Sequence, residues 1–247
     1  MHRQAIGIDI GGSSIKAAVV DLSRGCLVGE RHSVPSPAMS AVSEMLHAMA
    51  EAVPPDTAHL PAGVTFPGVV VAGTVHTAAN VAKSWIGQPL AEPAAQKLKR
   101  EVVAINDADA AGLAEVHFGA ARGVAGTVMV LSLGTGIGSA LFVDGHLVPN
   151  TELGHLELHG HDAEKRASVK AREDEDLSWE HWAHRLKKYL AHVEMLFSPG
   201  LFVIGGGVSR KAEKFLPLIQ GISAEIVPAE LQNSAGIVGA AMAAAEL

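Results

Sequence analysis

One pattern occurs twice in this chain and constrains its fold more than any other feature. A strand-like segment, a glycine-rich turn and a second strand-like segment follow one another at residues 5–20 and again at 127–143. Alternating apolar residues around such a turn predict a β-hairpin. Two similar hairpins, each followed by helical segments, predict an internally duplicated α/β fold.

The segments between and after the hairpins fit this α/β pattern. Helical spacing occurs at 40–52, 93–100, 108–118 and 179–197, and short apolar strands at 62–66, 69–71, 102–105 and 201–204. Residues 160–176 are rich in charged and small residues, so we expect an exposed, mobile insertion there. We expect a small N-terminal lobe at 1–107 and a larger C-terminal lobe at 108–235, with a C-terminal helix at 236–247 packing on the first lobe.

Composition excludes several classes of protein. The formal net charge of -7 is unlike that of a dedicated nucleic-acid binder, which is normally basic. The single cysteine, Cys26, allows neither an internal disulfide nor a C-x-x-C zinc site, and it fits a reducing cytoplasm. The first residues run directly into a strand, so we expect no signal peptide. The apolar run 236–245 is shorter than the roughly 20 residues of a membrane span, so we expect no membrane association.

The two glycine-rich turns are candidate phosphate-binding loops. Small residues let backbone N–H groups face a phosphate with no Cβ in the way. The residues concerned are Gly11, Gly12, Ser13, Ser14 and Lys16 in and after the first turn, and Gly134, Thr135, Gly136 and Gly138 in the second. Asp9, just before the first turn, is a candidate Mg²⁺ ligand, because Mg²⁺ needs only one or two carboxylates besides substrate phosphates. Ordinary hairpin turns with a solvated Asp9 are the alternative.

Asn106 and Asp107 stand at the end of a buried strand. Catalytic groups in α/β sheets lie at the carboxyl ends of strands, and a kinase needs a carboxylate to accept the proton of the attacking hydroxyl. Asp107 is therefore the candidate catalytic base. It could equally be the N-cap of the helix that begins at Ala108, since Asp is favoured there.

Two further segments carry polar or glycine-rich patterns. Glu152, His155 and Glu157 alternate with Leu or Gly, and such side chains suit the hydroxyl groups of a sugar. A helix cap for Glu152 and a structural role for His155 are the alternatives. The turn of Gly205, Gly206 and Gly207 after a buried strand could carry a nucleotide, or could simply be a tight strand-to-helix turn.

These motifs, taken in order, resemble the ROK sugar kinases of the actin/hexokinase superfamily. The match rests on Asp9-x-Gly11-Gly12-Ser13-x-x-Lys16, Asn106-Asp107, Leu133-Gly134-Thr135-Gly136-x-Gly138, Glu152-x-Gly154-His155 and Gly205-Gly206-Gly207. The resemblance implies a two-lobed fold, with a ribonuclease-H-like core in each lobe and a central cleft that closes on the sugar, and Asp107 as the base. It also implies homodimerisation. The residues that match or fall near sugar-contacting positions are Gly68, Asn80, Asn106, Asp107, Glu152, His155 and Glu157.

One departure from the family pattern is informative. Most ROK kinases carry a cysteine-rich zinc segment soon after the Glu-x-Gly-His motif, whereas residues 158–165 here contain no cysteine, so we expect no zinc. This region, with Ser178-Trp179-Glu180 and 192–199, resembles the polyphosphate glucokinase branch. That resemblance implies inorganic polyphosphate as donor, ATP as a second donor, and glucose as acceptor with mannose as a second sugar.

The sequence leaves open two alternative functions and two interpretations of its basic clusters. A strictly ATP-dependent glucokinase would also carry the turn at Gly205–Gly207. A catalytically silent ROK-type sugar sensor or regulator would need no base, and regulators carry a DNA-binding segment ahead of the core. The basic clusters at 97–100, 185–188 and 210–211 are either solvated helix faces or a track for a long polyanion.

Overall fold

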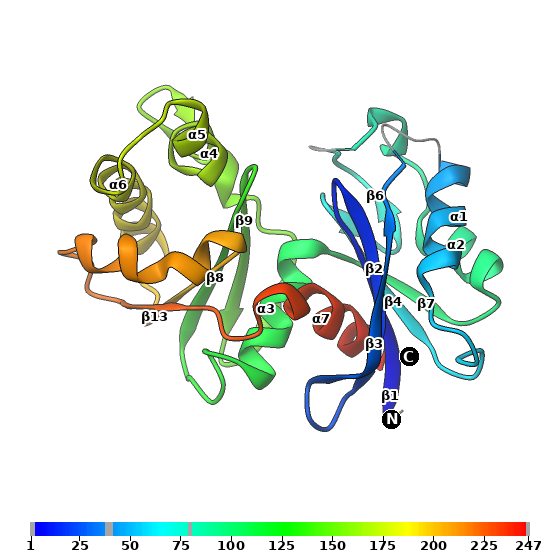
Figure 1. The fold of residues 1–247 in the computed structure, drawn as a ribbon. Coiled ribbons are helices and arrows are strands. Elements are labelled where there is room, and N and C mark those ends of the chain that lie inside the picture. The colour runs from blue at the N-terminus through cyan, green and yellow to red at the C-terminus, as the bar shows by residue number, and fades with distance from the viewer. Residues whose placement is uncertain (1–2, 38–41, 79–80, 246–247) are drawn as a thin grey trace. The chain divides into compact units, whose positions relative to one another are not determined.

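A computed structural model describes residues 3–37, 42–78 and 81–245 (Figure 1). The chain divides into two compact units, which are Met1–Ala114 with Ser234–Leu247 and Glu115–Asn233. Each unit contains one five-stranded mixed sheet and its own hydrophobic core. Within the described residues, no helix has the length and apolar character needed to cross a membrane.

The sheet of the first unit has the strand order β3-β2-β1-β4-β7. These strands are β1 (Gln4–Ile10), β2 (Ser14–Asp21), β3 (Cys26–Pro35), β4 (Ala62–Phe66) and β7 (Val102–Asn106). Strands β1, β2 and β3 pair antiparallel, whereas β4 is parallel to both β1 and β7. The three parallel strands therefore end at the same edge of the sheet.

Helices and short elements complete the first unit. Helices α1 (Val42–Ala52) and α2 (Ala91–Leu98) contact each other and the sheet, and a two-stranded hairpin of β5 (Val70–Val71) and β6 (Thr74–Val75) follows β4. A 3-10 turn, η1, covers Lys83–Trp85, and α3 (Asp107–Phe118) begins directly after β7. The core contains Met45 and Met49 of α1 packed with Ile6 and Ile8 of β1.

Helix α7 (Ala235–Ala244) packs on the sheet at a pair of glycines. Gly7 of β1 and Gly63 of β4 are register partners. A Cβ placed on Gly7 would lie 1.8 Å from the carbonyl oxygen of Ile237, and one on Gly63 would lie 1.7 Å from that of Ala240. The helix backbone thus rests directly on the strand backbones. Any larger residue at either position would push the helix away.

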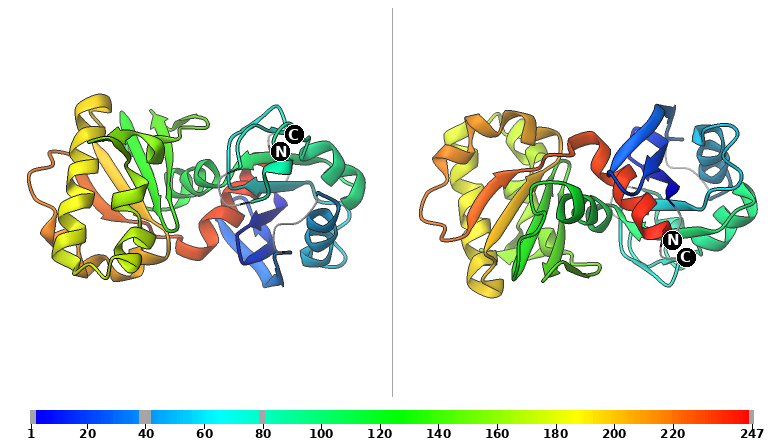
Figure 2. Two further views of the ribbon diagram at one scale, coloured as in Figure 1. Left: turned by 90° about the horizontal axis from the view of Figure 1, so that it is seen from above. Right: turned by 90° about the horizontal axis from the view of Figure 1, so that it is seen from below.

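The sheet of the second unit repeats the same arrangement, with the order β10-β9-β8-β13-β14. Its strands are the green to orange arrows in Figure 2. Its strands are β8 (Thr127–Leu133), β9 (Ile137–Val143), β10 (His146–Val148), β13 (Leu201–Gly205) and β14 (Glu225–Pro228). Again three strands pair antiparallel and the last two run parallel to the hairpin's first strand. The matching order and directions confirm the predicted duplication.

The other elements of the second unit follow the hairpin. They are η2 (Leu153–His155), β11 (Glu157–Leu158), β12 (His161–Asp162), α4 (Glu164–Ala167), α5 (Val169–Asp174), α6 (Trp179–Phe197), η3 (Gly207–Lys214), η4 (Leu216–Leu218) and η5 (Gln232–Ser234). Helix α6 packs its apolar side, including Trp182 and Tyr189, into the core with Met129 and Phe202 of the sheet.

The prediction of an exposed insertion at 160–176 is confirmed for many of its polar side chains but not for the segment as a whole. This segment forms β12, α4 and α5, and Ala163, Ala167 and Ala171 are buried. Its high charge density concealed small apolar residues at spacings of four, which form a buried face on a helical segment. The Trp182 indole N–H, which donates to the carbonyl oxygens of Ala167 and Ser168, attaches the segment to α6.

Most of the predicted elements are confirmed, with small differences in their bounds. Helix α6 has the predicted bounds, and the predicted C-terminal helix is α7, which begins one residue earlier. Three edge strands, β3, β10 and β14, were not predicted. They lie at the outer positions of the two sheets, where few neighbours impose the apolar alternation that identifies a strand.

We predict that Gly63→Ala lowers the free energy of unfolding by about 3 kcal/mol, at the upper end of the cost of overpacking, because its methyl group would overlap the backbone of α7. Gly12→Ala is the matched control, since no atom lies within 4 Å of a Cβ at that position. Urea unfolding monitored by circular dichroism measures both. Equal midpoints for the two variants would contradict the packing described for α7.

Candidate functional site

In the first unit, four of the predicted site residues lie at one edge of the sheet. Asp9 is the sixth of the seven residues of β1, Gly68 follows β4, and Asn106 and Asp107 stand at the end of β7 and the start of α3. Because β1, β4 and β7 are parallel neighbours, their carboxyl ends lie together. Asn80 lies outside the described residues.

Asn106 ties this edge together. It is 5% exposed, its side-chain Nδ2 donates to the carbonyl oxygen of Gly68 at 3.0 Å, and its Oδ1 accepts the N–H of Asp109 at 3.0 Å. A hydrogen bond to the N–H three residues ahead is that of an N-cap, so Asn106 rather than Asp107 caps α3 in this way. Asp107 Oδ1 accepts the N–H of the adjacent Ala108 at 2.9 Å.

Gly68 has a second constraint on its position. A Cβ there would lie 2.3 Å from the carbonyl oxygen of Thr77, so the two backbone segments are in direct contact. The Thr77 hydroxyl accepts the N–H of Val69 at 2.8 Å. Residues 66–69 are thus held from two sides, by Asn106 and by Thr77, and this fixes the backbone beside Asp107.

The Asp9 carboxylate is oriented by Thr65 of the neighbouring strand. The Thr65 hydroxyl donates to Asp9 Oδ1 at 3.0 Å and accepts the N–H of Ile10 at 3.0 Å. A Cβ at Gly236, in the first turn of α7, would lie 2.9 Å from the same carboxylate oxygen. Asp9 therefore occupies a position next to a helix N-terminus, where a negative charge is favoured. Lys16 is its cross-strand register partner on β2.

The first glycine-rich turn presents backbone N–H groups. The N–H of Gly11 closes the turn on the carbonyl oxygen of Ser14 at 3.0 Å, and Ser36 binds the carbonyl oxygens of Gly11 and Ser13. Over residues 3–37, 42–78 and 81–245, the N–H groups of Gly12 and Ser13 have no hydrogen-bond partner. Gly12 and Ser13 are exposed, so these donors are accessible to an anion.

The second glycine-rich turn also presents backbone N–H groups. The N–H of Gly134 bonds to the carbonyl oxygen of Gly136 at 3.0 Å, while the N–H groups of Thr135 and Gly136 have no partner in the described part of the chain. A Cβ at Gly134 would meet no atom within 4 Å, which leaves open space in front of the turn. Gly138 lies in β9, where it pairs with Ser132.

Segment 163–174 supports the second turn. Glu164 Oε2 accepts the N–H of Ile137 at 3.2 Å, and a Cβ at Gly136 would lie 2.3 Å from that oxygen. The N–H of Lys170 donates to the carbonyl oxygen of Gly134 at 3.1 Å. The turn is therefore held at both ends by residues that the sequence had suggested were mobile.

The turn at Gly205–Gly207 lies beside the second glycine-rich turn. Strands β8 and β13 are parallel, and Gly205 pairs with Ser132. Gly206 has φ +82, and a Cβ there would lie 2.2 Å from the carbonyl oxygen of Leu133. Glycine at 206 is thus required by a tight strand-to-helix turn. At Gly207 the nearest atom to a Cβ is the tip of Arg210 at 3.8 Å, which leaves room for a ligand.

Glu152 and His155 are brought close to the second turn by η2. A Cβ at Gly154 would lie 2.2 Å from the carbonyl oxygen of Ile137, and the Ser139 hydroxyl accepts the N–H of Leu153 at 3.0 Å. The segment is thus attached to β9. Glu152, His155 and the turn all lie within the same unit, on adjoining elements.

Three carboxylates surround the imidazole of His155. Its Nε2 lies 3.7 Å from Glu152 Oε2, and its Nδ1 lies 3.7 Å from both Asp162 Oδ2 and Glu164 Oε1. Sequence reasoning missed Asp162 and Glu164, because no motif connected them with His155 and the segment read as an insertion. Glu157 lies elsewhere, in a groove beside α6 with Lys188 and His192.

Burial raises the pKa of the Glu152 carboxyl, opposed by the attraction of His155 and reinforced by the repulsion of Glu164. Ionised Glu152 therefore costs folding free energy. This cost is absent below the ordinary pKa of the carboxyl group and is fully present above its raised pKa.

We predict that Glu152→Gln raises the melting temperature at pH 7.5, because the variant does not bury an ionised carboxylate. The difference in melting temperature between the variant and the wild-type protein should narrow at pH 5.

Glu157→Gln is the control for this prediction, since Glu157 is exposed on β11. Its melting temperature should follow that of the original protein at both pH values. A melting temperature for Glu152→Gln that falls at pH 7.5 would show that the ionised carboxylate stabilises the fold, contrary to the direction of the pKa change.

Comparison with known proteins gives consistent results. The family model of the ROK family matches residues 5–168. A polyphosphate glucokinase of Mycobacterium tuberculosis is 46% identical over 243 residues, which cover 98% of this chain and 91% of the relative. The crystal structure of an inorganic polyphosphate/ATP-glucomannokinase from Arthrobacter sp. strain KM superposes with a TM-score of 0.93 at 50% identity, covering 99% of both chains.

A more distant structure supports the same assignment. A ROK family glucokinase from Streptomyces griseus, in complex with glucose and AMPPNP, superposes with a TM-score of 0.82 at 26% identity and covers 99% of this chain and 100% of its own. The fold is thus that of the actin/hexokinase-like sugar kinases, as the order of the motifs predicted. On this sequence, topology and site geometry, the chain belongs to the ROK family.

Proposed function

We propose that this protein is a glucokinase that transfers the terminal phosphoryl group of inorganic polyphosphate to the 6-hydroxyl of glucose. The observation that carries the proposal is near-full-length identity of 46% to a polyphosphate glucokinase and of 50% to a polyphosphate/ATP-glucomannokinase. We further propose ATP as a second donor and mannose as a second acceptor, because the relative at 50% identity is a polyphosphate/ATP-glucomannokinase.

The geometry around Asp107 supports its role as the base. In the reaction, the Asp107 carboxylate takes the proton of the sugar hydroxyl while its oxygen forms a bond to the terminal phosphorus. The bond from that phosphorus to the bridging oxygen breaks, and the electron pair leaves with the shortened phosphate chain. Asn106 caps α3 and binds Gly68, so it positions Asp107 and the neighbouring backbone rather than taking the proton.

The two glycine-rich turns supply the donors that phosphoryl transfer needs. Negative charge is spread over the phosphoryl oxygens in the transition state, and fixed N–H groups stabilise it without having to reorient. The N–H groups of Gly12, Ser13, Thr135 and Gly136 have no partner within the described residues, which suits them to this task. Gly207, with open space beside it, is a candidate contact for a nucleotide when ATP is the donor.

Asp9 fits the requirements of a Mg²⁺ ligand. One of its carboxylate oxygens is held by the Thr65 hydroxyl, and Gly236 leaves space where a side chain would crowd the carboxylate. One carboxylate together with donor phosphates satisfies Mg²⁺, which would neutralise charge on the phosphate chain. Glu152 and His155 are proposed sugar ligands, with His155 oriented by Asp162 and Glu164.

We predict that Asp107→Asn lowers kcat/KM for glucose by about 10²–10⁴-fold with either donor, because general-base catalysis is lost. The fold should persist, since an amide oxygen can still accept the N–H of Ala108. Asp56→Asn, an exposed aspartate of the same unit, is the matched control and should retain activity. Turnover of Asp107→Asn close to that of the control would remove Asp107 from the role of base.

The donor is tested with the unchanged protein. We expect glucose 6-phosphate to form with Mg²⁺ and purified polyphosphate as the only donor, and also with ATP as the only donor, as measured by a coupled dehydrogenase assay. Activity with ATP alone would leave a strictly ATP-dependent glucokinase. Absence of turnover with both donors and with either sugar would favour a sugar sensor that resembles the kinases in fold.

A further inference from the structure

One side of helix α6 carries a stripe of basic side chains. Arg185, Lys188 and His192 follow one another at spacings of three and four residues, which places them on one face of the helix. The opposite face is buried in the core through Trp182, Leu186, Tyr189 and Val193. From Arg185 to His192 the stripe is about 10 Å long, at 1.5 Å per residue.

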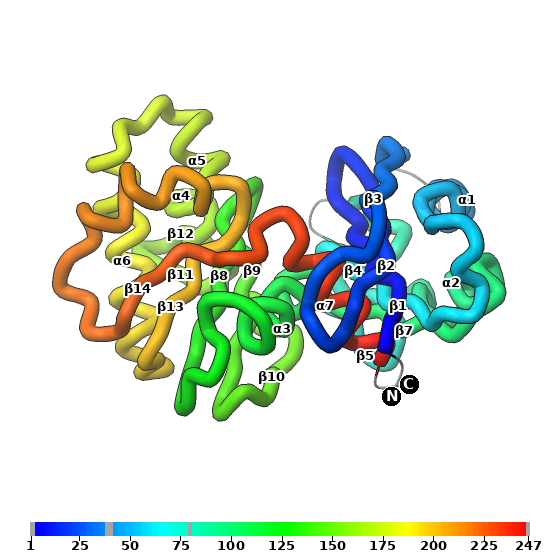
Figure 3. Tube along the Cα trace, turned by 60° about the horizontal axis from the view of Figure 1, so that its bottom comes forward, coloured from blue at the N-terminus to red at the C-terminus, as the bar shows by residue number. Residues whose placement is uncertain are grey.

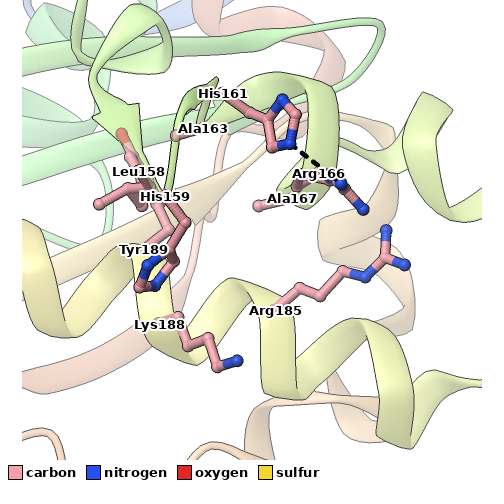
Figure 4. Close-up of a pocket in the computed structure, with 9 residues that line it drawn as sticks. All are labelled: Leu158, His159, His161, Ala163, Arg166, Ala167, Arg185, Lys188 and Tyr189. Atoms are coloured by element: carbon pink, nitrogen blue, oxygen red, sulfur yellow. Dashed lines mark hydrogen bonds between the residues drawn. The ribbon is translucent and has the colours of Figure 1, made fainter.

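This stripe forms one wall of a groove, part of whose lining is drawn in Figure 4. Figure 3 shows the backbones of α6, β11, β12 and α4, the elements that carry the lining residues. The β11–β12 hairpin and α4 form the other walls, with Leu158, Ala163 and Ala167 as apolar lining. The cavity is about 260 Å³, and a second hollow of about 510 Å³ continues it along α6 past His192 to Met195. The two hollows share Leu158, His159 and Lys188, so they adjoin each other along α6, and together they are called the groove here.

The groove carries more positive than negative charge. Arg166 of α4, together with Arg185 and Lys188 of α6, lines the first hollow, and His159 and His161 add further nitrogen groups (Figure 4). Arg185 forms a bidentate salt bridge with Glu175, which neutralises its charge. Nη1 lies 2.8 Å from Oε1 and Nη2 lies 2.6 Å from Oε2. Neither Arg166 nor Lys188 forms an ion pair with a carboxylate in the described part of the chain.

Two further groups affect this charge balance. Arg166 Nη2 lies 3.2 Å from His161 Nε2, and Figure 4 shows the two side chains pointing toward each other. Glu157 is the acidic residue that lines the second hollow. Glu175, which binds Arg185, also attracts Arg166. Among the residues that line the groove, Arg166 and Lys188 thus face one carboxylate, that of Glu157 in the second hollow.

The groove lies next to the second glycine-rich turn, on the far side of one short helix. In α4, Glu164 contacts the turn at Ile137, while Arg166 and Ala167, two and three residues later, line the groove. Arg166 therefore lies within one helical turn of Glu164, the residue that binds this turn. The triphosphate of ATP is too short to need such a surface, whereas a long polyphosphate has many phosphates beyond the reacting end.

We propose that this groove binds the part of a polyphosphate chain that lies beyond the phosphates held at the second turn. The proposal rests on the proposed function, in which polyphosphate is the donor, and it assigns the cluster at 185–188, through Arg185 and Lys188, to the polyanion. Lys188 and Arg166 act as the principal cationic contacts. Repeated phosphates, each with a negative charge, match a row of separated positive groups better than any compact anion does.

The test compares donors of different length in a Lys188→Ala, Arg166→Ala double variant. We expect its KM for long-chain polyphosphate to rise about tenfold, the equivalent of 1.4 kcal/mol of lost binding, while its KM for tripolyphosphate stays within about twofold. The rise should shrink as salt is added, because screening weakens the contacts of the original protein. The two single variants should each show a smaller rise.

Lys187→Ala is the matched control. Lys187 precedes Lys188 on α6 but lies against Gly221, where its Nζ is 3.5 Å from the position of a Cβ, and it does not line the groove. Lys187→Ala removes one positive charge from α6, as Lys188→Ala does. An equal KM for long-chain polyphosphate in Lys188→Ala and Lys187→Ala would overturn the proposal, as would an equal loss for long and short donors in the double variant.

A binding measurement separates this proposal from the proposed function. Calorimetric titration of the complete protein with long-chain polyphosphate, without sugar, requires no turnover. Affinity that falls in the double variant and not in Lys187→Ala supports the groove, whatever the donor preference of the enzyme. Affinity unchanged in the double variant overturns the groove, even where the original protein phosphorylates glucose from polyphosphate.

Discussion

The parallel pairing of β1, β4 and β7 is the constraint on which the first unit depends. It brings three strand ends to one edge of a sheet, so that Asp9, Gly68 and Asp107, which lie far apart in the sequence, share a small region. The backbone contact of α7 with Gly7 and Gly63 holds the same strands from one face. That helix also places its first turn next to Asp9, so one packing contact serves both the core and the site.

The second unit uses the same sheet for a different set of groups. Its parallel strands β8 and β13 place two glycine-rich turns side by side, and its hairpin strand β9 carries the segment with Glu152 and His155. In the first unit the strand ends carry Asp9 and Asp107 beside one glycine-rich turn, whereas two glycine-rich turns lie at the strand ends of the second unit. A duplicated fold allows this, because the sheet fixes where the turns lie and leaves their chemistry to a few residues.

The sequence predicted those elements whose pattern lies within one short segment of the chain. Strand, turn and strand occur within about 16 residues, so both hairpins and the order of the motifs could be predicted, and so could most helices from their spacing. Contacts between distant segments could not. The use of Asn106 as cap, Thr65 as the partner of Asp9, and Glu164 as the partner of both Ile137 and His155 depends on which strands and helices become neighbours.

Glu164 joins two parts of the second unit that carry different polar groups. One carboxylate oxygen binds the N–H of Ile137 in the glycine-rich turn, and the other lies 3.7 Å from the imidazole of His155. Both contacts come from one carboxyl group, so a substitution of Glu164 would disturb the glycine-rich turn and the surroundings of His155 together. The turn and the imidazole thus depend on the position of a single side chain.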